Sequence, residues 1–116
     1  MIEKRYDLEE RTEAFSKAVI SLCNDLPKST VNLELISQVV RSADSVGANY
    51  IEANERLSQK DFVNRIKICR KEARETRYWL RLIAPSNSSF ETQLVGLAQE
   101  ATELMNVFGA ILKNST

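Results

Sequence analysis

The chain has 116 residues, enough for one domain with a buried core, and its 16 basic and 16 acidic residues leave no formal net charge. No apolar stretch is long enough to span a bilayer and the start of the chain is charged, so we expect no membrane segment and a cytoplasmic location. The absence of histidine removes the commonest general base and the commonest transition-metal ligand. Composition therefore disfavours a membrane protein and most metal-dependent or hydrolytic enzymes.

The first predicted helix covers residues 8–26. Asp7 and Glu10 have the spacing of a capping box, in which side chains accept from free amides at a helix start. Pro27 is expected to end the helix, because a proline pushes the preceding residue out of the helical conformation. The apolar face between these signals consists of Leu8, Phe15, Ala18, Val19, Leu22 and Leu26.

The second predicted helix covers residues 31–57, with Thr30 as its cap. Its inward face is predicted to hold Leu35 or Ile36, Val39, Ala43, Val46, Gly47, Tyr50, Asn54 and Leu57. Small residues gather in its middle around Gly47, although glycine inside a helix costs about 1 kcal/mol relative to alanine. We therefore expect a close neighbour there, either Trp79 or an aromatic side chain of the first helix.

Two further helices are predicted at residues 59–83 and 89–113, each with apolar residues at alternating steps of four and three. The first of these seams contains Phe62, Ile66, Cys69, Ala73, Thr76, Leu80 and Ile83. The second contains Phe90, Leu94, Leu97, Ala101, Leu104, Phe108 and Ile111.

Capping signals and a proline mark where the helices in the second half of the chain begin and end. Ser58 with Asp61 and Ser88 with Glu91 have the capping-box spacing, and Pro85 closes the third helix. Connections of three to five residues make consecutive helices antiparallel neighbours. The sequence therefore predicts an all-α fold, an antiparallel up-down-up-down four-helix bundle in a single domain, residues 1–116.

The third helix is unusually basic. Its cationic residues are Lys60, Arg65, Lys67, Arg70, Lys71, Arg74, Arg77 and Arg81. These cations could neutralise phosphates, and the neighbouring Tyr78 and Trp79 rings could stack on a base. The candidate nucleic-acid contacts are Arg65, Arg70, Lys71, Arg74, Arg77 and Arg81. The alternative is a solvated face held by ion pairs such as Lys71 with Glu75, or pairing between subunits, and the near-neutral pI of 6.3 favours this alternative.

Catalytic and metal-binding patterns are weak in this chain. Three Glu-x-x-Glu pairs begin at Glu52, Glu72 and Glu100, and carboxylates on facing helices can hold two metal ions. These glutamates flank the apolar seams, however, and no histidine accompanies them. Phosphate loops, paired-cysteine zinc patterns and nucleophile elbows are missing too. We expect no enzyme, no metal and no cofactor, and we expect Cys23 and Cys69 to be buried free thiols.

Apolar residues beyond the seams are more numerous than one buried stripe per helix requires. They are Leu33, Val40, Ile51, Ile68, Trp79, Leu82, Val95, Met105 and Leu112. This surplus indicates either a thicker core or a subunit interface, and we favour the interface. Self-association is thus the first partner expected.

Five segments carry a family resemblance: residues 6–9 (YDLE), 26–27 (LP), 41–49 (RSADSVGAN), 60–62 (KDF) and 71–80 (KEARETRYWL). The chain resembles, over roughly residues 6–112, the four-helix-bundle family of proteins encoded in intervening sequences of bacterial 23S rRNA genes. The resemblance implies a ring-like homopentamer with no established enzymatic activity. In a related branch, the accessory proteins of diversity-generating retroelements, a basic pentamer binds the reverse transcriptase and nucleic acid, whereas this chain is neutral.

Several polar or small residues match the family motifs. We expect them to pack helices or to form a hydrogen-bonded network between the second and third helices or across subunits: Arg41, Ser42, Ser45, Gly47, Asn49, Glu52, Glu72, Arg74, Glu75, Tyr78 and Trp79. The leading functional hypothesis is a noncatalytic oligomeric scaffold or adaptor. The alternative is an RNA-binding protein that acts on ribosomal RNA or with a reverse transcriptase, and a hydrolase or metalloenzyme ranks last.

Overall fold

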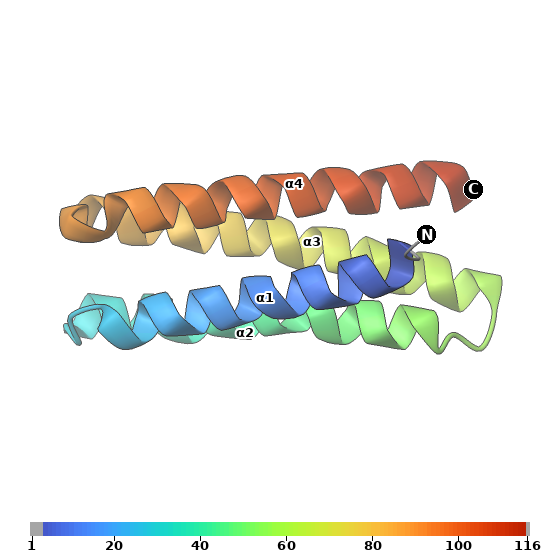
Figure 1. Ribbon diagram of the computed structural model, residues 1–116. Coiled ribbons are helices and arrows are strands. Elements are labelled where there is room, and N and C mark those ends of the chain that lie inside the picture. Colours follow the sequence, from blue (N-terminus) through green and yellow to red (C-terminus); the bar gives the residue numbers. More distant parts are fainter. Residues whose placement is uncertain (1–3, 116) are drawn as a thin grey trace.

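The structure, a computed structural model, describes the backbone of residues 4–115 and the side chains of residues 8–115. It contains four long helices, α1 (Lys4–Asp25), α2 (Thr30–Asn54), α3 (Gln59–Ile83) and α4 (Glu91–Ser115), in a bundle measuring 44 × 28 × 20 Å (Figure 1). Two 3₁₀ turns, Ala84–Ser86 and Ser88–Phe90, connect α3 to α4. The described backbone has no strand, and consecutive helices run antiparallel, which confirms the predicted all-α four-helix bundle.

The core follows the predicted seams closely. On α3 every seam residue except the half-buried Phe62 is buried, and on α4 Leu94, Ala101, Leu104 and Phe108 are buried. The Tyr50 and Phe108 rings meet at the centre with centroids 6.1 Å apart. Burial of such large side chains is the main source of the bundle's stability.

Two predicted inward residues are on the surface instead. Leu57 is 96% exposed, because α2 ends at Asn54 and Leu57 lies in the connection to α3. Ala18 is exposed on α1. An apolar residue can continue the helical period by chance after the helix itself has stopped, so spacing alone placed Leu57 wrongly.

The helix caps correct several predictions. The cap of α2 is Ser29, one residue before the predicted Thr30, and its hydroxyl accepts from the Asn32 amide at 3.1 Å. Ser58 caps α3 as predicted, by accepting from the Asp61 amide at 3.0 Å. The box predicted at Ser88 is wrong, since Ser88 begins a 3₁₀ turn that has no side-chain cap.

The start and end signals of two helices can also be compared with the structure. Helix α1 already begins at Lys4, so Asp7 is inside it rather than its cap, and the Asp7 side chain lies outside the described residues. Pro85 follows the end of α3 at Ile83, as predicted.

Gly47 is a point where α2 lies close to α1. A Cβ atom at Gly47 would lie 3.2 Å from Thr12 Oγ1 and 3.4 Å from Thr12 Cβ, tighter than an ordinary van der Waals contact. The expected close neighbour therefore exists, but it is Thr12 of α1 and not an aromatic ring. Trp79 lies elsewhere, beside Val31, Leu35 and Gln38.

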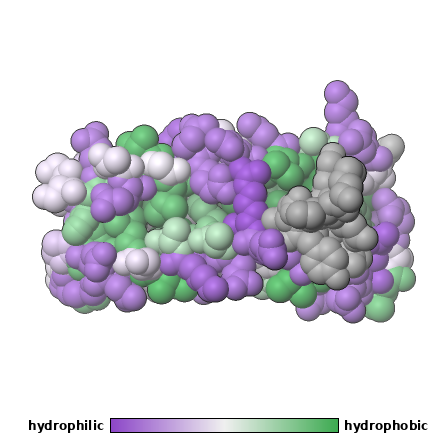
Figure 2. All heavy atoms as spheres, in the orientation of Figure 1, coloured by the Kyte–Doolittle hydropathy of each residue, from purple (hydrophilic) through white to green (hydrophobic). Residues whose placement is uncertain are grey.

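Helices α1 and α4 pack against each other less extensively than the other pairs of neighbouring helices in the bundle. Arg11 bridges them, with Nε 2.7 Å from Glu100 Oε2 and Nη2 3.1 Å from Glu103 Oε1. Hydrophobic surface shows between hydrophilic side chains on the side seen in Figure 2. Leu22 and Leu97 line a recess on this seam.

Both cysteines, Cys23 and Cys69, are buried and free. Burial raises the pKa of the Cys23 thiol to about 11 and that of Cys69 to about 12, so neither forms a thiolate readily. Among the described residues, no helix contains an apolar stretch long enough to cross a bilayer.

The surplus apolar residues divide between core and surface. Leu112 is buried, and Val40, Trp79 and Met105 are partly buried against the core. Leu33, Ile51, Leu82 and Val95 are exposed. The exposed members do not share one patch, because Ile51 borders the α1–α2 groove whereas Val95 borders the α3–α4 groove.

Candidate functional site

One side of α3 carries a row of cationic side chains. Their positions are related by steps of three, four or seven residues, which place them on one side of a helix. We call this row the basic face, and its members are Lys60, Lys67, Arg70, Lys71, Arg74, Arg77 and Arg81. At 1.5 Å per residue, the row extends for about 30 Å along α3.

The basic face borders the groove between α3 and α4. Arg77 Nη1 donates to Thr102 Oγ1 of α4 at 3.2 Å. Arg81 lines a recess of about 200 Å³ whose remaining walls are uncharged and include Val95 and Ala98. The neighbouring part of α4 thus supplies packing and one hydroxyl, and no carboxylate, to this recess.

None of the seven cations takes part in an ion pair among the described residues. The predicted pair of Lys71 with Glu75 does not form, because Glu75 Oε1 lies 3.5 Å from Arg41 Nη2 on the other side of α3. The alternative expected from the sequence, a face neutralised by its own ion pairs, is therefore wrong for this chain by itself.

Arg65 does not belong to the basic face, although it was a candidate contact. Its Nη1 donates to Asn49 Oδ1 of α2 at 3.1 Å, and its Nε lies 3.8 Å from Asp61 Oδ1. Arg65 is thus directed toward α2, away from α4. The structure brings together the other five candidates, Arg70, Lys71, Arg74, Arg77 and Arg81.

The two aromatic candidates on α3 differ in exposure. Tyr78 is 55% exposed and shares the side of the helix that carries Arg74 and Arg81. Trp79 is half-buried against α2, and its buried Nε1 has no hydrogen-bond partner among the described residues. Only Tyr78 is therefore available to a ligand on the basic face.

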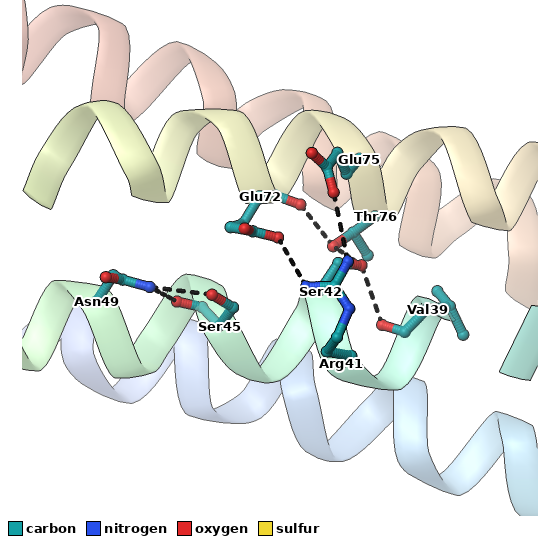
Figure 3. A network of polar contacts seen from close by, with 8 residues as sticks. All are labelled: Val39, Arg41, Ser42, Ser45, Asn49, Glu72, Glu75 and Thr76. Carbon is teal, nitrogen blue, oxygen red and sulfur yellow. Dashed lines mark hydrogen bonds and ion pairs between the residues drawn. The ribbon is translucent and has the colours of Figure 1, made fainter. Parts of the chain in front are cut away.

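A second group of polar residues connects α2 to α3 (Figure 3). Thr76 Oγ1 donates to Ser42 Oγ at 2.8 Å, and Ser42 donates in turn to the Val39 carbonyl oxygen at 3.2 Å. The Thr76 hydroxyl also lies 2.7 Å from the carbonyl oxygen of Glu72. Ser42 and Thr76 are both fully buried, so these bonds satisfy polar groups inside the core.

Glu72 is the unusual member of this group. The residue is only 7% exposed, and its Oε1 has no hydrogen bond, although Arg41 Nη1 lies 3.8 Å away. Burial raises the pKa of Glu72, and the nearby Glu75 raises it further, while Arg41 and Lys71 act in the opposite direction. Arg41 bridges both glutamates at the groove surface.

The remaining predicted members of the polar network lie apart from Glu72. Asn49 Nδ2 donates to the carbonyl and hydroxyl oxygens of Ser45, each at 2.9 Å, and Asn49 Oδ1 accepts from Arg65, so Asn49 forms a second polar link between α2 and α3 as predicted. Glu52 is exposed, and Gly47 faces α1. The network joins α2 to α3 within one chain through Arg41, Ser42, Glu72, Glu75 and Thr76.

Two of the three Glu-x-x-Glu pairs form ion pairs with an arginine. Glu100 and Glu103 both contact Arg11, and Glu72 and Glu75 both contact Arg41. Among the described residues, no group of three or more acidic or cysteine side chains is arranged to hold a metal ion. These carboxylates therefore connect neighbouring helices.

Comparison with known proteins gives the family. A family model described as 23S rRNA-intervening sequence protein matches residues 4–110. The chain belongs to this family. The match confirms the resemblance found in the sequence motifs, and neither it nor the structural comparison below indicates an enzyme family.

This 23S rRNA-intervening sequence protein is also similar to a solved structure. A protein with unknown function from the S23 ribosomal protein family of Bacteroides thetaiotaomicron VPI-5482 has a TM-score of 0.86 and 29% sequence identity to this chain. The similarity covers 96% of this chain and 99% of that chain. A search of curated proteins found no match.

Sequence analysis missed several polar contacts of this 23S rRNA-intervening sequence protein. Asn32 and Asn87 pair in the core, and Lys28 Nζ donates to the Cys23 carbonyl oxygen at 2.8 Å at the end of α1. Arg11 reaches across to α4. Lys28 beside Pro27 was a visible signal, since cations often bind carbonyls at helix ends, whereas the other two contacts join residues far apart in sequence.

Proposed function

We propose that this protein acts without catalysis, as a helical scaffold that presents the basic face of α3 to RNA in the cytoplasm. The observation that carries the proposal is the row of seven cations on one side of one helix, none of which forms an ion pair with another described residue. Arg70, Lys71 and Arg74 are exposed at its centre.

Unpaired cations in a row favour a polyanionic partner. A protein that places several Lys or Arg side chains on phosphates releases condensed counterions, and this release drives binding. The whole chain has no net charge, so a row of seven cations on one side of α3 makes its charge distribution uneven, and such unevenness orients a charged partner. The family's name refers to a location within 23S rRNA genes, so a fragment of that RNA is the first polyanion to test. The unpaired thiols of Cys23 and Cys69 agree with a reducing compartment.

The test is binding of a labelled RNA, followed by fluorescence anisotropy between about 50 and 200 mM salt. The double variant Arg70→Gln with Arg74→Gln should bind more weakly, and the slope of log affinity against log salt should become shallower by about 1 to 2. Both side chains are exposed, so the variant should keep the fold.

A matched control removes two charges elsewhere. Lys17 on α1 and Arg56 after α2 are exposed and outside the basic face, so Lys17→Gln with Arg56→Gln should leave the salt slope unchanged. Absence of RNA binding by the unmodified protein at low salt, or equal losses in the two double variants, would contradict the proposal.

Self-association as a homopentamer is the second candidate property of the scaffold. The groove between α2 and α3 supports it, because a recess there of about 400 Å³ is lined by Val31, Leu35 and Trp79, and Val31 is 59% exposed. Trp79 Nε1 and Glu72 Oε1, two buried atoms with no hydrogen bond among the described residues, both belong to the α2–α3 contact. A second copy seated on this groove would cover its apolar wall.

Light scattering coupled to size-exclusion chromatography measures the assembly. The proposal predicts a species of five times the 13.2 kDa monomer, and Val31→Lys should shift it toward the monomer. A clean monomer at micromolar concentration would count against self-association and would leave the RNA proposal standing.

A further inference from the structure

Tyr78 is an exposed aromatic ring in the middle of cations. Arg74 precedes it by four residues and Arg81 follows it by three, so the three residues share one side of α3. At 55% exposure, it is one of the more exposed large hydrophobic side chains in the described part of the chain. The ring packs against Trp79 at one edge, and the rest of it faces solvent.

The ring is held at one edge and open elsewhere. Its centroid lies 5.0 Å from that of Trp79, with an angle of 66° between the planes, so the neighbouring indole limits its motion without covering it. A positioned ring among cations suits a planar, partly apolar group that is attached to phosphates.

We propose that the basic face binds single-stranded RNA and that Tyr78 stacks on one of its bases, an inference that rests on the proposed function. In an RNA duplex the bases are stacked on one another and paired, so an aromatic side chain has no base face to reach. In a single strand the base faces are open, and stacking on aromatic side chains combines with phosphate neutralisation. Tyr78 supplies the stacking, and Arg74 and Arg81 supply the charge on either side.

The experiment compares a labelled single strand of about 12 nucleotides with a duplex of the same length. The unmodified protein should prefer the single strand. Tyr78→Ala should weaken binding of the single strand by about tenfold or more, with little change in the salt slope, because no phosphate contact is lost. Tyr78→Phe keeps the ring and should bind like the unmodified protein.

A second measurement uses Trp79, the one tryptophan of the chain. Because Trp79 touches Tyr78, a base stacked on Tyr78 should change Trp79 fluorescence on addition of the unlabelled single strand, and the duplex should not. This comparison uses the unmodified protein and therefore holds even if Tyr78→Ala folds poorly.

The outcomes separate this inference from the function on which it rests. Equal or tighter binding of the duplex, or full binding by a folded Tyr78→Ala variant, would overturn the role of Tyr78 while salt-sensitive binding through Arg70 and Arg74 continued. Failure of the unmodified protein to bind either RNA at low salt would overturn both.

Discussion

Asn32 and Asn87 exchange two hydrogen bonds through their side-chain amides, although 55 residues separate them in sequence. Asn32 Nδ2 lies 2.8 Å from Asn87 Oδ1, and Asn87 Nδ2 lies 3.0 Å from Asn32 Oδ1. Each amide also donates to a backbone carbonyl at 2.8 Å, Asn32 to Pro27 and Asn87 to Ile83. This buried pair ties the turn before α2 to the turn after α3.

Loss of either partner should destabilise the protein. Asn87→Ala leaves Asn32 Oδ1 without its donor and one hydrogen of Asn32 Nδ2 without its acceptor in the core, which should lower the free energy of unfolding by about 1 to 3 kcal/mol. Urea denaturation measures the change. Asn106→Ala, at an exposed site on α4, is the control and should change stability by no more than about 0.5 kcal/mol.

The pair should also show coupling in a double-mutant cycle. Asn32→Ala with Asn87→Ala should cost less than the sum of the single changes, because neither amide is then left facing an empty site. Strict additivity would show that the two side chains act independently.

Gly47 should tolerate no larger side chain. Gly47→Leu places atoms where Thr12 of α1 already lies, so we expect a loss of about 1 to 3 kcal/mol in the free energy of unfolding. Gly96→Ala is the matched comparison on α4, because nothing lies within 4 Å of the new Cβ. That variant should gain about 0.5 to 1 kcal/mol from helix propensity. An unchanged melting temperature for Gly47→Leu would mean that the helices separate there without cost.

Glu72 should make stability depend on pH in an identifiable way. Because its pKa is raised in the folded state above the reference value of 4.5, the protonated form is favoured by folding, and the stability gained from protonation is lost as pH rises through the folded pKa. Glu72→Gln mimics the protonated form. It should therefore be more stable than the unmodified protein at pH 7, and the difference should shrink toward pH 4.

Urea denaturation from pH 4 to pH 8 measures this difference. Glu52→Gln is the control, since Glu52 is exposed on α2 and its substitution should leave the pH profile unchanged. If Glu72→Gln is less stable at pH 7, the contact with Arg41 outweighs the burial of the carboxylate.

Arg11 should hold α1 onto α4. Arg11→Met removes the paired bonds to Glu100, at 2.7 and 2.9 Å, and the contact with Glu103. We expect a loss of about 1 to 2 kcal/mol, since these charge-assisted bonds are partly shielded from solvent. Amide hydrogen exchange should quicken in α1 more than in α3. Lys17→Met removes an exposed pair with Glu13 within α1 and should have little effect.

Much of the fold was accessible from the sequence because each helix carries its own signals. The seam from Ile66 to Ile83 is local, and burial follows directly from its spacing. The caps were less accessible, because Ser29 and Thr30 are equally good capping residues one position apart. Leu57 was misplaced because its spacing continues a helix that ends at Asn54.

The candidate site divides in the same way. The basic face was readable as a set of like charges at helical spacing, and the structure kept every member except Arg65. Whether those charges are neutralised was not readable, because Glu75 has Lys71 as a neighbour on α3 and Arg41 as a neighbour on α2, and only packing selects Arg41. Tyr78 and Trp79 are adjacent in sequence, yet one is exposed and the other is covered by α2.

The sequence by itself determined four amphipathic helices, their order, and the concentration of positive charge on one of them, because helix formation and helical spacing depend on residues a few positions apart. Only the tertiary structure decided that Thr12 meets Gly47, that Asn32 pairs with Asn87, and that Arg41 and Arg11 occupy the carboxylates of α3 and α4. Those contacts join residues that are distant in the chain, so they are fixed by the rotation and register of packed helices, which no local pattern specifies.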